Sequence, residues 1–238
     1  MKKIFIHGGS SEITKNLVNF FYDSFDEFHI FVRNFSKAKK NLAPFDKKII
    51  FYVNSLDNIK KTLIDIENLP NDLTSIIWLS GSPGESQKEF ADLDLCKKTI
   101  EINFTNVVLS LNLILQKKLL IQSESFLCVF TSVAGLRGRH FNTFYGAAKS
   151  GLISYLSSLR QRFNNKMLVL TVIPGYMRTN KYTLTAPTFL TSSAEKSAKI
   201  VYISIKKKKE IIYIDYKWAL IMKIILFIPE IIFKKLKF

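Results

Sequence analysis

The chain has little of what builds disulfide frameworks or metal centres. It contains two cysteines, Cys96 and Cys128, and three histidines, His7, His29 and His140. None of these residues has the spacing of metal ligands, so the sequence predicts no metal site. Both cysteines stand in apolar surroundings and are expected to fill the core. A reducing, cytoplasmic compartment suits this usage.

Long hydrophobic runs, internal repeats and Pro- or Gly-rich linkers are also missing. The apolar run at the N-terminus, Ile4–Ile6, is too short for a signal peptide. The stretch Trp218–Phe233 falls short of the roughly 20 apolar residues that span a bilayer. The length of 238 residues suits one α/β domain. We therefore expect a single catalytic domain over 1–215 and an apolar, basic tail over 216–238.

Acidic residues are scarce. The chain has 19 Asp and Glu against 35 Lys and Arg, a formal charge of +16. A strongly basic surface suits an anionic partner such as nucleic acid, anionic lipid or a phosphorylated substrate. An AT-rich genome, which favours Lys, Ile, Phe and Asn codons, explains the same excess. No zinc-finger, RRM or KH pattern is present, so we expect no nucleic-acid partner.

Short apolar runs alternate with helix-length segments along the chain. This alternation indicates a parallel sheet covered on both faces, and right-handed crossovers then give a Rossmann-type, doubly wound α/β fold. The expected strands are Ile4–His7, His29–Val32, Ile49–Val53, Ser75–Leu79, Ser125–Thr131, Leu168–Ile173 and Glu210–Ile214. The expected helices include Glu12–Tyr22, Leu56–Glu67 and Thr143–Phe163.

A pair of glycines at the first junction between strand and helix suggests a nucleotide site. Glycine permits a tight turn close to a phosphate, and the helix N-terminus offers free N–H groups to it. An ordinary turn is the alternative interpretation, but the position at the first junction favours a nucleotide. The residues expected to contact it are Gly8, Gly9, Ser10, Ser11, Glu12 and Ile13.

The end of the second expected strand carries Arg33. Dinucleotide folds that prefer NAD place an acidic residue there, whereas an arginine can bind the 2′-phosphate of NADP. A solvated surface arginine is the alternative. We expect the cofactor to be NADP(H).

The most informative pattern joins Ser132, Tyr145 and Lys149. Ser132 follows a buried strand, and Tyr145 and Lys149 share one helix face because they are four residues apart. A phenol with a pKa of about 10 is a poor acid–base catalyst at neutral pH. A nearby ammonium group favours the phenolate and lowers that pKa. Ser132 can hold a substrate oxygen by a hydrogen bond.

The stretch from Thr131 to Gly135, read with Tyr145 to Lys149, resembles the short-chain dehydrogenase/reductase family, and the resemblance covers nearly the whole chain. It implies an NAD(P)-dependent oxidoreductase in which Tyr145 transfers the proton and Lys149 also binds the nicotinamide ribose. It implies that Asn103 holds a water of the proton relay. Further cofactor contacts implied by the resemblance fall on Asn54, Gly81, Pro174, Gly175 and Thr179. Family members are often homo-oligomers.

The chain departs from the family pattern at several positions. The usual Thr-Gly-x-x-x-Gly-x-Gly reads here from His7 to Thr14, with Glu12 and Thr14 in place of the second and third glycines. Asn54 replaces an Asp that commonly meets the adenine. Ser80 stands where the Asn-Asn-Ala-Gly segment of the family has Ala.

One subgroup is similar in its Gly-Gly-Ser-Ser-Glu-Ile variant and in a tail with Trp218 and Ile228-Pro229 before a basic end. These are the decaprenylphosphoryl-2-keto-ribose reductases, which reduce a keto-sugar on a polyprenyl phosphate. The resemblance implies such a substrate, whose phosphate Arg137 and Arg139 could bind; solvated surface arginines are the alternative. A 3-oxoacyl thioester or a small ketone is the alternative substrate. A non-catalytic NADP-binding regulator is the alternative of another class.

The tail Trp218–Phe238 combines bulky apolar residues with lysines. We expect it to lie on an anionic membrane surface, with Trp218, Phe227 and Phe233 at the headgroups, so that a cytoplasmic protein is held peripherally on the inner face. The competing interpretation is that the same residues cover a sheet edge or form a dimer contact.

Overall fold

The computed structural model of the chain describes residues 1–84, 86–117, 124–178 and 187–236. Its centre is a seven-stranded, fully parallel sheet in the order β3-β2-β1-β4-β5-β6-β9. The strands are β1 (Lys3–His7), β2 (Glu27–Val32), β3 (Ile49–Val53), β4 (Leu73–Trp78), β5 (Phe126–Phe130), β6 (Leu168–Ile173) and β9 (Ile211–Tyr213). The strand order reverses between β1 and β4, as in a doubly wound fold. This confirms the predicted fold class.

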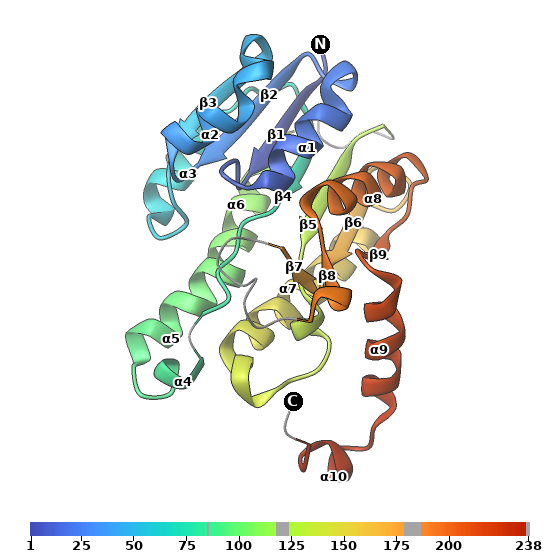
Figure 1. Cartoon of the computed structure of the whole chain (residues 1–238). Helices are drawn as coiled ribbons and strands as arrows, with labels where there is room; N and C mark the ends of the chain where they lie inside the picture. The colour runs from blue at the N-terminus through green and yellow to red at the C-terminus, as the bar shows by residue number, and fades with distance from the viewer. Residues whose placement is uncertain (85, 118–123, 179–186, 237–238) are drawn as a thin grey trace.

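Helices cover both faces of the sheet (Figure 1). One layer contains α1 (Glu12–Phe21), α2 (Phe35–Leu42) and α8 (Ala194–Lys206), and the other contains α3 (Ile59–Glu67), α6 (Asn106–Leu115) and α7 (Thr143–Arg162). Successive strand residues serve opposite layers: Ile4 and Ile6 pack with the first, while Phe5 packs with the second. Burial on both faces explains why the strands read as continuous apolar runs.

Side-chain caps decide where several helices begin. The expected helix Leu56–Glu67 begins at Ile59, because the Asn58 side chain accepts a hydrogen bond from Lys61 N. Ser11 caps α1 through Ile13 N. The expected strand Glu210–Ile214 shortens to Ile211–Tyr213.

Smaller elements lie beyond the carboxyl ends of the strands. They are α4 (Ser86–Glu89), α5 (Leu93–Ile100), β7 (Tyr176–Met177), β8 (Thr191–Ser192), α9 (Tyr216–Phe227) and α10 (Glu230–Phe233). Short 3-10 turns occur at Tyr22–Ser24, Ala43–Lys48, Val133–Gly135, His140–Asn142 and Thr188–Leu190, and a π-helical turn at Glu101–Thr105 joins α5 to α6. No described helix is long and apolar enough to cross a bilayer.

Candidate active site

The polar residues singled out in the sequence follow the carboxyl ends of neighbouring strands. Gly8 follows β1, Arg33 follows β2, Gly81 lies beyond β4, Ser132 beyond β5 and Pro174 directly after β6. Because the strands are parallel, these positions meet along one edge of the sheet. The strand order reverses there, which is where doubly wound folds bind their ligands.

The loop from Gly8 to Ser11 requires both of its glycines. Gly8 has φ of +114°, a conformation that other residues rarely adopt. A Cβ at Gly9 would lie 2.3 Å from Ile30 Cγ2 and 2.5 Å from Val32 Cγ1. The amides of both glycines donate to the carbonyl oxygen of Phe31. The loop therefore lies directly on β2, as a phosphate-binding turn does.

Two departures from the family pattern in this loop have different consequences. Thr14 is fully buried, and its hydroxyl donates to the Gly8 carbonyl at 2.9 Å. It therefore braces the turn in place of the third glycine. Glu12 is exposed in the first turn of α1. A carboxylate there stabilises the helix N-terminus but would repel a bound phosphate.

His7 and Ser80, two further departures, form one hydrogen-bonded pair. His7 Nδ1 lies 2.5 Å from Ser80 Oγ, at hydrogen-bond distance. The ring stacks on Trp78, with centroids 4.1 Å apart. Burial lowers the pKa of His7 to about 3, which keeps the imidazole neutral. The described residues contain no cluster of three or more metal-ligating side chains.

The ends of β2 and β3 provide groups suited to the adenosine half of a dinucleotide. Arg33 is exposed. Ser10 Oγ donates to Asn34 O at 3.3 Å, and this bond joins the glycine loop to the residues that follow β2. Asn54 is buried and donates to Asp65 at 3.0 Å, while its Oδ1 has no partner among the described residues. A buried acceptor without a donor is costly. The exocyclic amino group of an adenine would satisfy it, so the residues present fit a dinucleotide.

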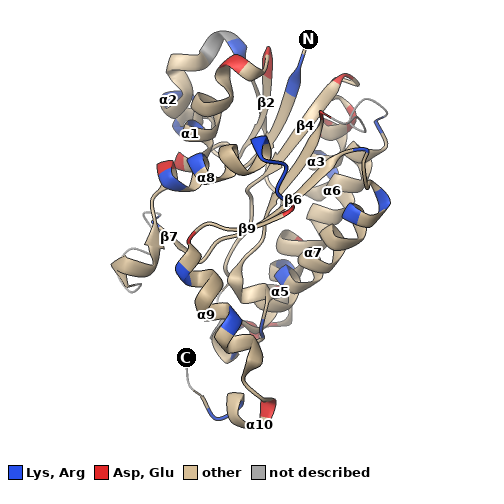
Figure 2. Ribbon diagram, turned by 90° about the vertical axis from the view of Figure 1, so that its right-hand side faces the viewer, with Lys and Arg blue, Asp and Glu red and all other residues tan. Residues whose placement is uncertain are grey.

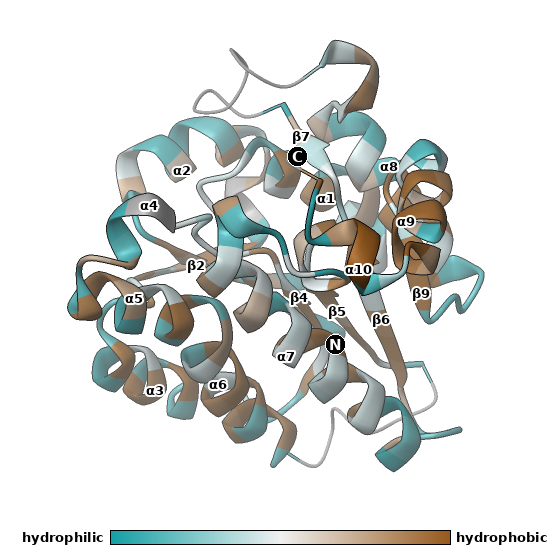
Figure 3. Cartoon of the chain, turned by 90° about the horizontal axis from the view of Figure 1, so that it is seen from below, coloured by the Kyte–Doolittle hydropathy of each residue, from teal (hydrophilic) through white to brown (hydrophobic). Residues whose placement is uncertain are grey.

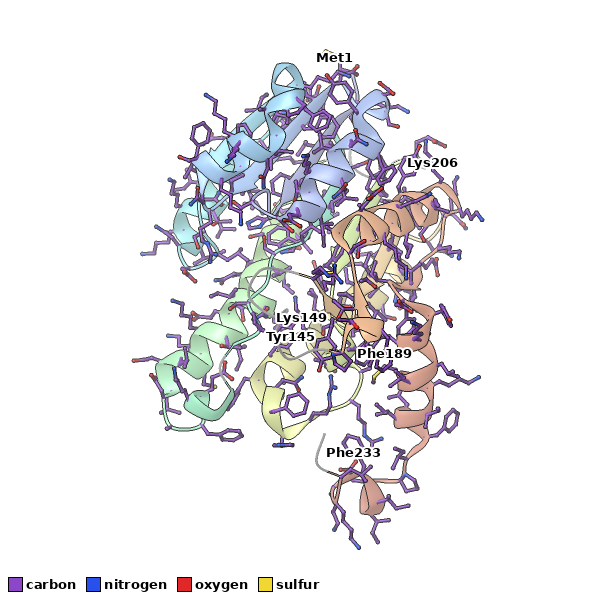
Figure 4. All side chains as sticks on the ribbon, in the orientation of Figure 1. Met1, Tyr145, Lys149, Phe189, Lys206 and Phe233 are labelled. Carbon is purple, nitrogen blue, oxygen red and sulfur yellow. The ribbon has the colours of Figure 1, made fainter. Side chains whose placement is uncertain are left out.

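Tyr145 and Lys149 lie next to each other on α7 (Figure 4). Lys149 Nζ is 5.7 Å from the centroid of the Tyr145 ring and donates to the carbonyl oxygen of Phe130 at 3.4 Å. The lysine side chain is buried, and burial lowers its pKa to about 8. At neutral pH it is therefore still mostly an ammonium group, close to the phenol.

Ser132 begins the turn that follows β5. Its Oγ accepts a hydrogen bond from Ala134 N at 3.1 Å. The hydroxyl hydrogen is therefore left to donate to a substrate oxygen. The amide of Val133, the next residue, donates to Pro174 O at 3.0 Å and joins this turn to the end of β6.

Two glycines hold the Ser132 turn against α7. A Cβ at Gly135 would lie 2.7 Å from the carbonyl carbon of Lys149, and one at Gly146 would lie 3.0 Å from Ala134 O. The turn and the helix therefore touch backbone to backbone, which fixes Ser132 relative to Tyr145. The sequence showed both glycines as parts of the motif, but their contact is a tertiary feature.

This contact leads to a test of positioning. In Gly135→Ala the new methyl group meets backbone atoms, so the Ser132 turn must shift. A misplacement of about 1 Å can cost about 100-fold in rate, and we expect kcat to fall at least about tenfold. Steady-state kinetics checks this, with Gly138→Ala as the matched control, because a Cβ at Gly138 meets nothing within 4 Å. Equal activity of the two variants would contradict the assigned role.

Asn103 lies fully buried on the π-helical turn between α5 and α6. Its Oδ1 accepts from Ser82 N at 3.0 Å, and its Nδ2 donates to Ser82 O and Thr99 O. The side chain thus clamps the loop after β4 to the helix. Both amide hydrogens are engaged, so a relay water there would bind a carbonyl oxygen. A Cβ at Gly81 would crowd both Asn103 Oδ1 and Lys149 Nζ.

Gly175 lies under the indole of Trp218. A Cβ there would be 1.9 Å from Trp218 Nε1, and this nitrogen donates to Leu190 O at 2.9 Å. The expectation that Trp218 sits at lipid headgroups is therefore wrong: its side chain is buried beside Val133 and Ile173. The sequence could not show this, because Gly175 and Trp218 are far apart along the chain. Thr179 lies outside the described residues.

The segment after Ser132 borders a cavity of about 470 Å³ that includes Arg137, Arg139 and His140 in its wall. Its α7 residues, Thr143, Gly146, Ala147 and Ser150, are on the flank away from Tyr145, since a helix turns by about 100° per residue. Arg137 is engaged with Glu230 Oε2 at 2.6 Å. The Arg139 guanidinium lies 5.4 Å from the Phe141 ring. These contacts place neither arginine on the flank of α7 that carries Tyr145.

Comparison with known proteins gives one family. The sequence model of a protein family described as "short chain dehydrogenase" matches residues 2–187 of the chain. A curated relative, "Dehydrogenase/reductase SDR family protein 7-like" from Dictyostelium discoideum, is 29% identical over 105 residues, which are 43% of this chain and 32% of the relative. The chain thus spans about a third of the length of the curated relative it matches.

Solved structures share the fold. A short-chain dehydrogenase from Burkholderia cenocepacia in complex with NADP has a TM-score of 0.79 at 13% identity, covering 95% of this chain and 98% of its own. One from Streptomyces avermitilis has a TM-score of 0.80 at 12% identity, covering 95% and 93%. A putative betaketoacyl-ACP reductase has a TM-score of 0.74 at 17% identity, covering 90% and 95%.

Proposed function

The chain belongs to the short-chain dehydrogenase family, and from this premise we propose that it is an NADP(H)-dependent reductase that converts a ketone into a secondary alcohol. The observation that carries the proposal is the buried ammonium of Lys149 beside the phenol of Tyr145, next to the Ser132 turn. A module that only binds a nucleotide has no need of a serine, a phenol and a buried cation held together. The arrangement therefore favours an enzyme over a regulator.

A nicotinamide cofactor held by this site would supply the hydride. Tyr145 donates its hydroxyl proton to the carbonyl oxygen as that oxygen gains negative charge. The ammonium of Lys149 favours the phenolate that remains. Ser132 donates a hydrogen bond to the same substrate oxygen and orients the carbonyl, while the clamp of Asn103 on Ser82 holds the neighbouring loop. The tight turn at Gly8 and Gly9 leaves room for a pyrophosphate at the N-terminus of α1, where the carboxylate of Glu12 is expected to weaken its binding.

The preference for NADP(H) rests on Arg33. Its exposed guanidinium follows β2, near the start of α2 with Lys37, and Asn34 caps that helix by accepting from Lys37 N. The 2′-phosphate of NADP(H) would meet positive charge and helix N–H groups there. NAD(H) binding usually relies on an acidic residue at this strand end that accepts from the ribose hydroxyls, and neither Arg33 nor Asn34 is acidic.

We expect Arg33→Asp to reverse this preference. The variant should bind NADPH at least about tenfold more weakly, since a charge-assisted bond is lost and a like charge faces the phosphate, while NADH binding improves. Fluorescence titration of both dissociation constants checks this. Arg162→Asp, at the end of α7, is the control for net charge. Wild-type protein that binds NADH as tightly as NADPH would contradict the assignment.

For the substrate we propose a keto-sugar carried on a polyprenyl phosphate. Two features support it: the sequence resemblance to enzymes of that kind, and the exposed apolar helices that lie beside the Ser132 turn. Oxidation of NADPH should be followed with such a lipid-linked ketone, a 3-oxoacyl thioester and a small ketone. Faster turnover of the thioester would assign that substrate instead, and no turnover of any ketone would leave a cofactor-binding module.

A further inference from the structure

Helix α9 has two apolar faces, and only one of them is covered. Trp218 and Met222 on the inner face are buried against Val133 and Ile173. On the outer face, Leu220 and Ile224 are each 60% exposed and Phe227 is 78% exposed. Residues spaced i, i+4 and i+7 form one stripe along a helix. The helix is therefore anchored in the fold while it presents an uncovered apolar stripe to solvent.

The next helix extends this surface. Ile231 and Ile232 of α10 are 67% and 52% exposed, and both helices are strongly apolar when the molecule is seen from below (Figure 3). We call the exposed residues Leu220, Ile224, Phe227, Ile231 and Ile232 the outer stripe. Several large apolar side chains exposed on two successive helices are typical of an interaction site.

Arg137 contacts α10 and the residues just before it. Arg137 Nη2 donates to Ile228 O at 3.2 Å and to Glu230 Oε2 at 2.6 Å, and its guanidinium lies 4.3 Å from the centroid of the Phe233 ring. Arg137 belongs to the segment that follows Ser132. The outer stripe is thus joined to the loop beside the catalytic serine and does not hang from the fold as a separate tail.

The charge around the outer stripe is predominantly positive. From Lys206 onward the sequence holds nine lysines and three acidic residues. Two of these acids are paired within the protein, Asp215 with Lys196 at 3.1 Å and Glu230 with Arg137. Lysines remain along α9 and after α10, and Figure 2 shows blue Lys or Arg positions in both places.

We propose that α9 and α10 dock the protein on an anionic membrane surface. The outer stripe enters the headgroup region, and Lys223, Lys234 and Lys235 contact anionic lipid. A second copy of this chain is the competing occupant, but it would bring two equally basic surfaces together. Through Arg137, docking places the Ser132 loop close to the bilayer. Delivery of a lipid-linked ketone there rests on the proposed function, whereas the docking itself does not.

The burial of Trp218 and Met222 decides how to test this. Truncation after Asp215 would remove core residues and damage the fold, so point substitutions in the full chain are needed. The triple variant Leu220→Ser/Ile224→Ser/Phe227→Ser removes only exposed apolar groups. The matched control is Ile64→Ser/Ile203→Ser, at positions that are 57% and 40% exposed on α3 and α8.

Co-sedimentation with phosphatidylglycerol/phosphatidylcholine vesicles, without cofactor or substrate, gives the readout. We expect wild type and control to bind, the triple variant to bind at least about tenfold more weakly, and Lys223→Gln/Lys234→Gln/Lys235→Gln to lose the preference over pure phosphatidylcholine. High salt should weaken binding of the wild type. Equal binding of wild type and triple variant, or no binding by wild type, would overturn the proposal.

Tryptophan emission gives an independent test. The two native tryptophans, Trp78 and Trp218, are buried, so added vesicles should change only the emission of a tryptophan introduced at the surface. In Phe227→Trp the new indole should shift to shorter wavelength when the anionic vesicles are added, while in Ile64→Trp it should not. Sedimentation velocity of the wild type and the triple variant tests the competing possibility, that a second copy of the chain binds the outer stripe. A change from dimer to monomer with vesicle binding intact would assign the stripe to a subunit interface. Because no ketone is present, failure here leaves the proposed reductase activity untouched.

Discussion

Tyr145→Phe is expected to lower kcat by about 10²–10⁴-fold while NADPH binding stays near the wild-type value. The substitution removes the phenolic hydroxyl that the proposed mechanism uses to protonate the substrate oxygen. The ring itself remains, so its contact with Lys149 and the packing on α7 are kept. The measurement is the rate of NADPH oxidation at saturating ketone, together with a fluorescence titration of the cofactor.

The matched control is Tyr155→Phe on the same helix. Tyr155 packs against the core cluster of the α6–α7 layer, away from the Ser132 turn, so its loss should leave kcat within about twofold of wild type. If Tyr145→Phe kept more than about half of the wild-type kcat, Tyr145 would not transfer the proton. An equal loss in both variants would indicate a general effect on α7.

Lys149→Met should lower kcat/KM by about 100-fold or more and weaken cofactor binding, because one ammonium group serves both the phenol and the ribose. The variant should nevertheless unfold at the same temperature as wild type or higher. Lys149 is buried without a carboxylate partner among the described ion pairs, and methionine fills a similar space without a charge. Lys166→Met, beyond the end of α7, is the control.

The pH dependence of kcat/KM tests whether the positive charge of Lys149, and not only the space that its side chain fills, is needed for activity. Burial lowers the pKa of this lysine to about 8, so the ammonium form is present below that pH and is lost as the pH rises through it. The kcat/KM for reduction, which reports groups of the free enzyme, should therefore fall above about pH 8 in wild type. In Lys149→Met this inflection should disappear. A profile with the same inflection in both proteins would assign it to another group.

The sequence predicts local structure well because the relevant patterns are short. Strands buried on both faces read as apolar runs, and the structure confirms the parallel sheet that they predict. The pairing of Tyr145 with Lys149 follows from helix periodicity alone and needs no knowledge of the rest of the fold. The glycine loop is likewise a local feature, since the positive φ of Gly8 is a property of one residue.

The sequence could not show which departures from the family pattern depend on each other. His7 and Ser80 look like two independent changes, yet their side chains form one hydrogen bond between adjacent strand ends. Likewise, the orphan oxygen of Asn54 appears only once its burial and its bond to Asp65 are known. Burial and pairing depend on the complete set of neighbours, which a linear pattern does not contain.

The amino-acid sequence by itself determined the order of strands and helices, the family, and the residues proposed for proton transfer, because each of these depends on spacing over a few residues. Only the tertiary structure decided what surrounds them. It placed Trp218 over Gly175, tied Arg137 to Glu230 across 93 positions, and pressed Gly135 onto the backbone of α7. These contacts join segments far apart in the chain, and close packing of the whole domain selects them.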